Sequence, residues 1–135
     1  MRDLEDLAEA LRGVLSGEEK VLAAYLFGSK ARGESSPESD VDVAVLLSEL
    51  PENLLDFYLS LAGRLVEAAG NVDLVIANLA PPALNFQVIS RGRLVYCRDE
   101  RARIAFEARV LDEFMDLSRA LRRYDECMLE EILSR

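Results

Sequence analysis

Three aspartates lie in otherwise apolar stretches and could together hold a metal ion. Asp40 and Asp42 flank Val41 at the start of the run VDVAVLL, and Asp73 is the single charge in the later run VDLVIA. Residues i and i+2 of a strand share one face at a separation of about 6.6 Å, so the first two carboxylates point the same way. They repel one another unless a cation lies between them, and oxygen ligands of this kind suit Mg²⁺. If the two strands are neighbours, the three carboxylates form a site suited to two-metal phosphoryl or nucleotidyl transfer.

Each aspartate also has an interpretation that involves no ligand. Asp40 and Asp42 could be the solvated start of a strand, and Asp73 could reach solvent from the first turn of its strand. We favour metal binding for the pair and a catalytic role for Asp73, because an unpaired carboxylate buried in an apolar strand would cost several kcal/mol.

The segment before the paired aspartates could bind phosphate. The apolar run VLAAYLF is followed by Gly28 and Ser29. Glycine lets the backbone approach a ligand with free N–H groups, and the serine hydroxyl adds a donor. Lys30 and Arg32 could neutralise phosphate charge or could be exposed turn residues, and the sequence leaves both open. A P-loop is excluded, because Glu-Ser follows the GxxxxG spacing where Lys and Ser or Thr are required.

The composition excludes several classes of enzyme. The 135 residues include no histidine, which rules out a Ser-His-Asp triad, a Cys-His pair and a His-ligated zinc site. Cys97 and Cys127 form no CxxC and are too few for a disulfide framework, so we expect reduced thiols. No apolar run approaches the ~20 residues of a membrane span, and the acids among the first residues do not fit a signal peptide. We therefore expect a cytoplasmic protein without membrane contact.

The net charge of −9 argues against direct binding to bulk nucleic acid. Residues 34–56 hold seven acids and no Lys or Arg, whereas residues 91–109 hold six arginines against three acids. An acidic patch facing a basic one would suit a metal-bound polyphosphate, although solvated helix surfaces explain most of these charges equally well. Arg91 and Arg93 could reach a nucleotide, but we expect them to face solvent.

The predicted elements that position these residues alternate between helix and strand. Apolar periodicity, Gly and Pro predict strands over 21–27, 41–47, 72–77 and 93–97, and helices over about 3–16, 51–70, 81–90 and 99–134. This order predicts an α/β fold with one mixed sheet of about four strands flanked by helices. We expect a single domain over residues 1–135, with a core at about 20–97.

The last predicted helix carries more apolar surface than its own fold requires. A seam with spacings of four and three residues is formed by Val110, Phe114, Leu117, Leu121, Tyr124 and Met128. A second set widens this surface, namely Leu111, Met115, Leu129 and Leu133. Packing on the sheet or on the first helix is the commoner outcome, but the width indicates that part of the helix binds a partner protein or a second copy of the chain.

The motifs GSKARG, SDVDV and VDLVI resemble those of the minimal nucleotidyltransferases (MNT) of the DNA polymerase beta superfamily. The resemblance covers about residues 20–97 and implies a polymerase beta-like nucleotidyltransferase fold. It further implies that Gly28 and Ser29 bind the triphosphate of ATP and that Asp40 and Asp42 hold Mg²⁺ in a two-metal site. By the same resemblance, Asp73 is a metal ligand or a base toward the attacking hydroxyl.

The resemblance also implies an activity and a partner. MNT proteins are commonly encoded beside a HEPN-domain ribonuclease, and the two act as an antitoxin and a toxin. This chain is therefore predicted to transfer AMP from ATP to a tyrosine hydroxyl of such a toxin. One alternative is a non-catalytic module that neutralises its partner sterically through the last helix. Another is an aminoglycoside-type transferase, which usually needs an added acceptor-binding domain.

Overall fold

A computed structural model describes residues 4–28 and 40–134 of the chain. The elements follow the predicted order, and most bounds agree within a few residues. The third strand ends at Ile76, one residue earlier than predicted, because a short 3₁₀ helix begins at Ala77. The strands are β1 (Val21–Phe27), β2 (Val41–Leu47), β3 (Val72–Ile76) and β4 (Arg93–Cys97), and the helices are α1 (Leu4–Leu15), α3 (Leu54–Ala69), η1 (Ala77–Leu79), α4 (Pro82–Arg91) and α5 (Glu100–Leu133).

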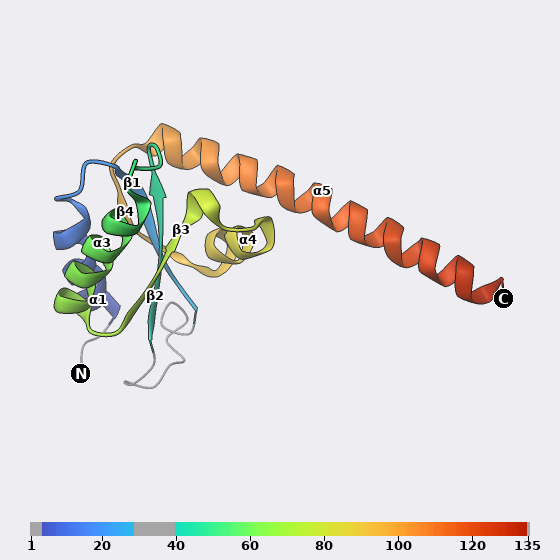
Figure 1. Ribbon diagram of the computed structural model, residues 1–135, viewed down its shortest axis with the longest axis horizontal. Helices are drawn as coiled ribbons and strands as arrows, with labels where there is room; N and C mark the ends of the chain where they lie inside the picture. Colours follow the sequence, from blue (N-terminus) through green and yellow to red (C-terminus); the bar gives the residue numbers. More distant parts are fainter. Residues whose placement is uncertain (1–3, 29–39, 135) are drawn as a thin grey trace.

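The four strands form one mixed sheet in the order β3-β2-β1-β4. Strand β1 pairs antiparallel with β2 and with β4, whereas β2 and β3 are parallel and are connected through α3. Helices α1 and α3 cover one face of the sheet, and α4 and the start of α5 lie on the other (Figure 1). The predicted mixed α/β fold with a long C-terminal helix is confirmed.

Strand β2 shows why the sequence of a central strand is almost continuously apolar. Val41, Val43 and Val45 belong to the core cluster that includes α1 and α3. Ala44 and Leu46 alternate with them and belong to the opposite cluster, which includes α4 and α5. Because helices cover both faces of the sheet, every residue of β2 but one is apolar. Asp42 is that exception, and by alternation it lies on the face of α4 and α5.

Asn78 of η1 continues the hydrogen bonding of β2 at the end of the strand. Its Nδ2 donates to the Leu47 carbonyl at 2.9 Å, and its Oδ1 accepts from the Leu47 N–H at 2.8 Å. We expect Asn78→Ala to lower the free energy of unfolding by about 1–2 kcal/mol, since two backbone groups lose their partner. Urea denaturation measures this loss. Asn71→Ala serves as a matched control with little expected change, because Asn71 accepts from Val41 through its carbonyl, which alanine keeps.

Helix α5 is packed over its first half only. Phe106 and Val110 are buried in the cluster that contains Tyr25, and the ring of Phe114 stacks on Phe86 of α4 at 3.9 Å between centroids. From residue 119 to residue 134 every residue is exposed, and the helix extends well beyond the sheet (Figure 1). Among the residues that the structure describes, no helix combines the length and the apolar character needed to cross a bilayer.

Candidate active site

The parallel pairing of β2 and β3 brings two of the predicted aspartates side by side. Asp42 is directly in register with Asp73, and Phe27 at the end of β1 pairs with Asp42 from the other side. Asp40 is exposed and lies just before β2. The condition that the sequence analysis placed on Asp73, that its strand neighbours that of Asp42, is therefore met.

Gly28 packs against the Asp42 carboxylate. Its φ of +74° lies in the left-handed region, and a Cβ added to it would lie 2.2 Å from Oδ2 of Asp42. Only a residue without a side chain allows this approach. The sequence motif indicates only phosphate binding for Gly28, because its contact with Asp42 depends on the register of β1 and β2. Ser29, Lys30 and Arg32 lie outside the described residues.

Burial and the neighbouring carboxylates both act on Asp42. Burial raises the pKa of the partly buried Asp42 carboxyl above its ordinary value of 3.8, and the negative charges of Asp73 and then Asp40 raise it further. By contrast, Asp40 and Asp73 are exposed. Neighbouring carboxylates disfavour one another's ionised forms, and a bound cation would relieve this repulsion.

The donor set fits a hard divalent cation in an open site. Within residues 4–28 and 40–134, no three acidic or thiol side chains converge into a metal-binding cluster. The carboxylates therefore form a neighbouring pair with a third at its rim rather than a closed cage. Mg²⁺ is usually held in this way, by one or two carboxylates with phosphate oxygens and water completing the octahedron.

The raised pKa of Asp42 has a consequence for stability. A carboxyl whose folded-state pKa is raised contributes stability below its unfolded-state pKa, and this contribution is lost as the pH rises through the folded-state value. We therefore expect Asp42→Asn, which cannot ionise, to raise Tm at pH 7 in EDTA. The gain should shrink as the pH falls toward 3.8. Thermal unfolding by circular dichroism at pH 7 and pH 3.5 measures the difference, and an equal gain at both pH values would contradict it.

The arginines between residues 91 and 109 are mostly engaged within the fold. Arg91 is exposed, as expected. Arg93, expected to face solvent, is half-buried and donates to a carboxylate of α1, so that expectation is only partly met. Three of the six arginines thus form ion pairs with near neighbours, and a fourth donates to backbone carbonyls. The contacts are those of Arg93 with Glu5, Arg98 with the carbonyls of Ser16 and Glu18, Arg103 with Glu100 and Glu107, and Arg109 with Glu113.

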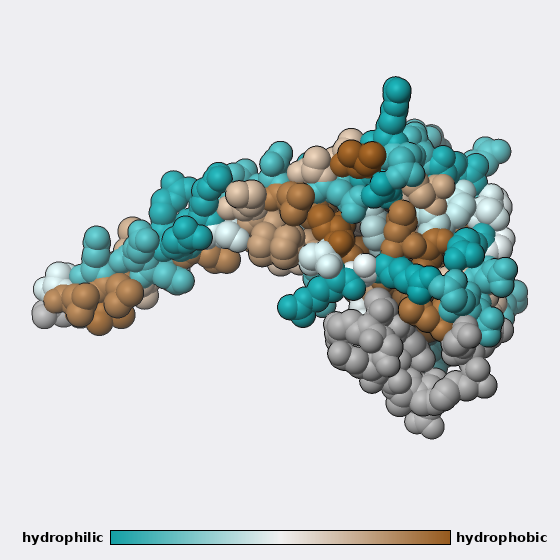
Figure 2. Space-filling view, turned by 180° about the vertical axis from the view of Figure 1, so that it is seen from behind, coloured by the Kyte–Doolittle hydropathy of each residue, from teal (hydrophilic) through white to brown (hydrophobic). Residues whose placement is uncertain are grey.

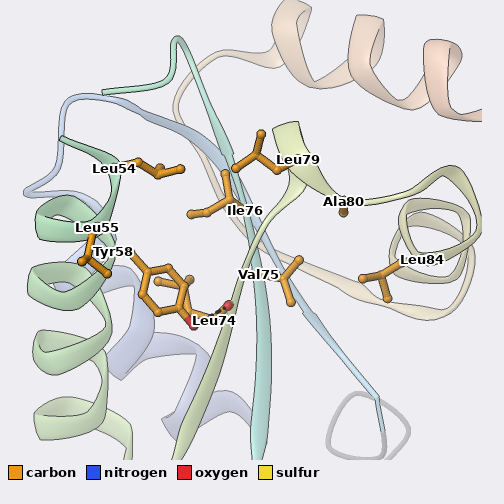
Figure 3. A pocket seen from close by; sticks show the side chains of 9 residues that line it. All are labelled: Leu54, Leu55, Tyr58, Leu74, Val75, Ile76, Leu79, Ala80 and Leu84. Atoms are coloured by element: carbon orange, nitrogen blue, oxygen red, sulfur yellow. Dashed lines mark hydrogen bonds between the residues drawn. The ribbon is translucent and has the colours of Figure 1, made fainter. Parts of the chain in front are cut away.

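A separate apolar pocket of about 480 Å³ lies on the edge of β3, between α3 and the segment of η1 and α4 (Figure 3). Its lining includes Leu74, the residue that follows Asp73. The Tyr58 hydroxyl at its wall donates to the Leu74 carbonyl at 2.9 Å. No lining residue is charged, so a triphosphate bound there would lose its hydration without compensation. The phosphates therefore fit the aspartate end of the sheet better. The lining residues are Leu54, Leu55, Tyr58, Leu74, Val75, Ile76, Leu79, Ala80 and Leu84.

Residues 9–101 match the model of the family described as "Polymerase beta, Nucleotidyltransferase". The chain belongs to this family. The matched range includes Gly28 and all three aspartates, and the resemblance inferred from the sequence motifs is confirmed. The chain is thus a nucleotidyltransferase by family.

This nucleotidyltransferase has similar proteins among curated sequences and solved structures. It is 35% identical over 78 residues to the protein adenylyltransferase MntA of Shewanella oneidensis, a match that covers 57% of this chain and 55% of MntA. The match thus spans about half the length of that relative. A relative from Methanocaldococcus jannaschii is 38% identical over 79 residues, covering 56% of this chain and 79% of that protein. A crystal structure described as a toxin-antitoxin with AMP-PNP aligns with a TM-score of 0.73 and 26% identity, over 90% of this chain and 98% of that chain.

Proposed function

We propose that this nucleotidyltransferase transfers AMP from ATP to a hydroxyl group of a protein partner. The observation that carries the proposal is the register of Asp42 with Asp73, which sets two carboxylates side by side at one end of the sheet with Asp40 at the rim. The similarity to a protein adenylyltransferase and to a toxin-antitoxin that contains an ATP analogue supports adenylyl transfer to a protein.

In the proposed reaction, Asp40 and Asp42 hold the divalent metal, and Asp73 is a metal ligand or a base. When bound, Mg²⁺ neutralises the phosphate charge and polarises the α-phosphorus. The acceptor oxygen forms a bond to the α-phosphorus while the bond between that phosphorus and the bridging oxygen to the β-phosphate breaks, and pyrophosphate leaves. Asp73 is exposed, so an acceptor hydroxyl can reach it and transfer its proton to the carboxylate. Gly28 and Ser29 bind the triphosphate, and Lys30 and Arg32 stay predictions for the same role.

We further propose that the partner is a HEPN-domain ribonuclease toxin and that the chain is its antitoxin, acting in the cytoplasm. The motif resemblance implies this pairing, and the similar solved structure is itself a toxin-antitoxin. Free Cys97 and Cys127 agree with a reducing compartment. We do not expect a protein of charge −9 to bind RNA, but it is suited to bind a protein whose basic surface binds RNA.

The test is transfer of label from ATP to a purified HEPN-domain ribonuclease. With Mg²⁺ present, label at the α-phosphate should appear on the ribonuclease, whose mass should rise by one AMP. Label at the γ-phosphate should not be transferred, and EDTA should stop the reaction. Transfer of the γ-phosphate would show kinase chemistry. A lack of any transfer would show that the ribonuclease is not the acceptor.

A second candidate function is favoured by the exposed distal half of α5. This half offers an apolar surface that could cover a partner without any chemistry, as in the steric alternative. The double variant Asp40→Asn/Asp42→Asn separates the two functions. Full protection of cells from the ribonuclease by this variant would favour steric neutralisation, whereas loss of protection would favour adenylylation.

A further inference from the structure

The apolar seam of α5 continues without interruption from the packed half of the helix into the projecting half. In the packed half, Phe106 and Val110 are buried against the sheet, and Phe114 is stacked on α4. The same face then presents Leu121 and Ile132 with 57% and 54% of their surfaces exposed. Brown apolar side chains gather along the projecting helix in Figure 2. We name the projecting part of the seam the distal stripe, formed by Leu117, Leu121, Tyr124, Met128 and Ile132.

The charges that border the distal stripe are acidic. At 100° per residue, Asp125 and Glu131 lie beside the stripe. The basic residues of this half are also exposed but lie farther around the helix, roughly 120° or more from the centre of the stripe, and are Arg119, Arg122 and Arg123. The face that needs a partner is therefore apolar at its centre and negative at its margin.

We propose that the distal stripe docks a basic protein surface with an apolar groove, and that this is where the chain holds its protein partner. The inference rests on the proposed function for the partner's identity. A ribonuclease must present positive charge to its RNA, and the acidic margin of the stripe and the net charge of −9 are complementary to such a surface. An apolar stripe on a helix is the feature that a hydrophobic groove recognises.

The same charges disfavour a second copy of the chain as the occupant. In a parallel pair of α5 helices, Asp125 and Glu131 of one chain would lie next to the same residues of the other chain. In an antiparallel pair that matches Leu117 with Ile132, Asp125 would lie against the ring of Tyr124 from the other copy. Both arrangements would also bring together two chains of charge −9. We therefore expect the chain alone to sediment as a monomer at tens of micromolar.

The docking test measures the affinity of the 135-residue chain for the purified HEPN-domain ribonuclease by biolayer interferometry. Leu121→Asp places a charge at the centre of the stripe and should weaken binding about 30-fold or more. The double reversal Asp125→Lys/Glu131→Lys should weaken binding about tenfold, mainly through the association rate, and should reduce its dependence on salt. The matched reversal Arg119→Glu/Arg122→Glu, outside the stripe, should not weaken binding, because it adds no positive charge to the chain. Because the substituted residues are exposed, circular dichroism of each variant should match that of the wild type.

The outcomes separate docking from catalysis. Asp42→Asn should bind the ribonuclease as the wild type does, whatever its activity. If the stripe variants lose affinity but no AMP is transferred, docking stands and the proposed reaction fails. If AMP is transferred and the stripe variants bind unchanged, docking by the stripe is wrong. A dimer of the isolated chain that Leu121→Asp dissociates would overturn the proposal in favour of a second copy, and absence of any binding by the wild type would overturn it as well.

Discussion

Asp42→Asn should slow AMP transfer by at least about 10³-fold while leaving the protein folded. Asp42 is the carboxylate that receives the charge of both Asp73 and Asp40, and it is the most buried of the three. An amide at this position keeps the shape but removes the negative charge that a divalent cation needs. Loss of several kcal/mol of charge stabilisation in the transition state corresponds to a rate loss of about this size. Initial rates of label transfer from ATP at saturating Mg²⁺ measure the effect.

The same substitution separates a metal ligand from a structural carboxylate. Mg²⁺ should raise the Tm of the wild type by mass action and should raise that of Asp42→Asn much less. Asp112→Asn, an exposed position on α5, changes the net charge equally and should keep both the rate and the response to Mg²⁺. Transfer of AMP by Asp42→Asn at the wild-type rate would show that Asp42 does not hold the catalytic metal.

The order of elements could be predicted because each strand is an apolar run bounded by polar or turn residues. Strands at 21–27, 41–47 and 93–97 have the predicted bounds. Helix starts were less certain from the sequence, since Pro51 suggests an early start whereas the helix begins at Leu54. The reason is local, because the Asn53 side chain accepts a hydrogen bond from the Asp56 N–H and caps the helix there.

The site could be predicted in composition but not in arrangement. The spacing of Asp40 and Asp42 is a property of one strand, whereas the approach of Asp73 depends on which strands pair and in what register. The alternation within one strand favours a register but does not say which strand is its neighbour. The seam of α5 shows the same limit. Its residues follow from their spacing, but only the structure shows that the seam is covered or partly covered as far as Leu117 and exposed from Leu121 onward.

Gly28→Ala should lower both stability and activity, because the new methyl group would occupy the space of the Asp42 carboxylate. The Cβ would lie 2.2 Å from Oδ2 and 3.2 Å from Cγ of Asp42, at a φ of +74° that L-residues rarely adopt. The backbone conformation and the displaced side chain together should cost about 2–3 kcal/mol in the free energy of unfolding. A carboxylate displaced by about 1 Å should slow AMP transfer about 100-fold. Urea denaturation and initial rates of label transfer measure the two effects.

Two variants test whether the contact between Gly28 and Asp42 causes this loss. Gly13→Ala introduces the same methyl group inside α1, where no atom lies within 4 Å of the new Cβ, and should instead stabilise the protein by about 0.5–1 kcal/mol. In an Asp42→Ala background the clash is absent, so Gly28→Ala should retain only the cost of its left-handed backbone. The two substitutions should therefore be non-additive, as expected for residues in contact. Additive losses would show that Gly28 acts through its backbone conformation alone and does not shape the position of the Asp42 carboxylate.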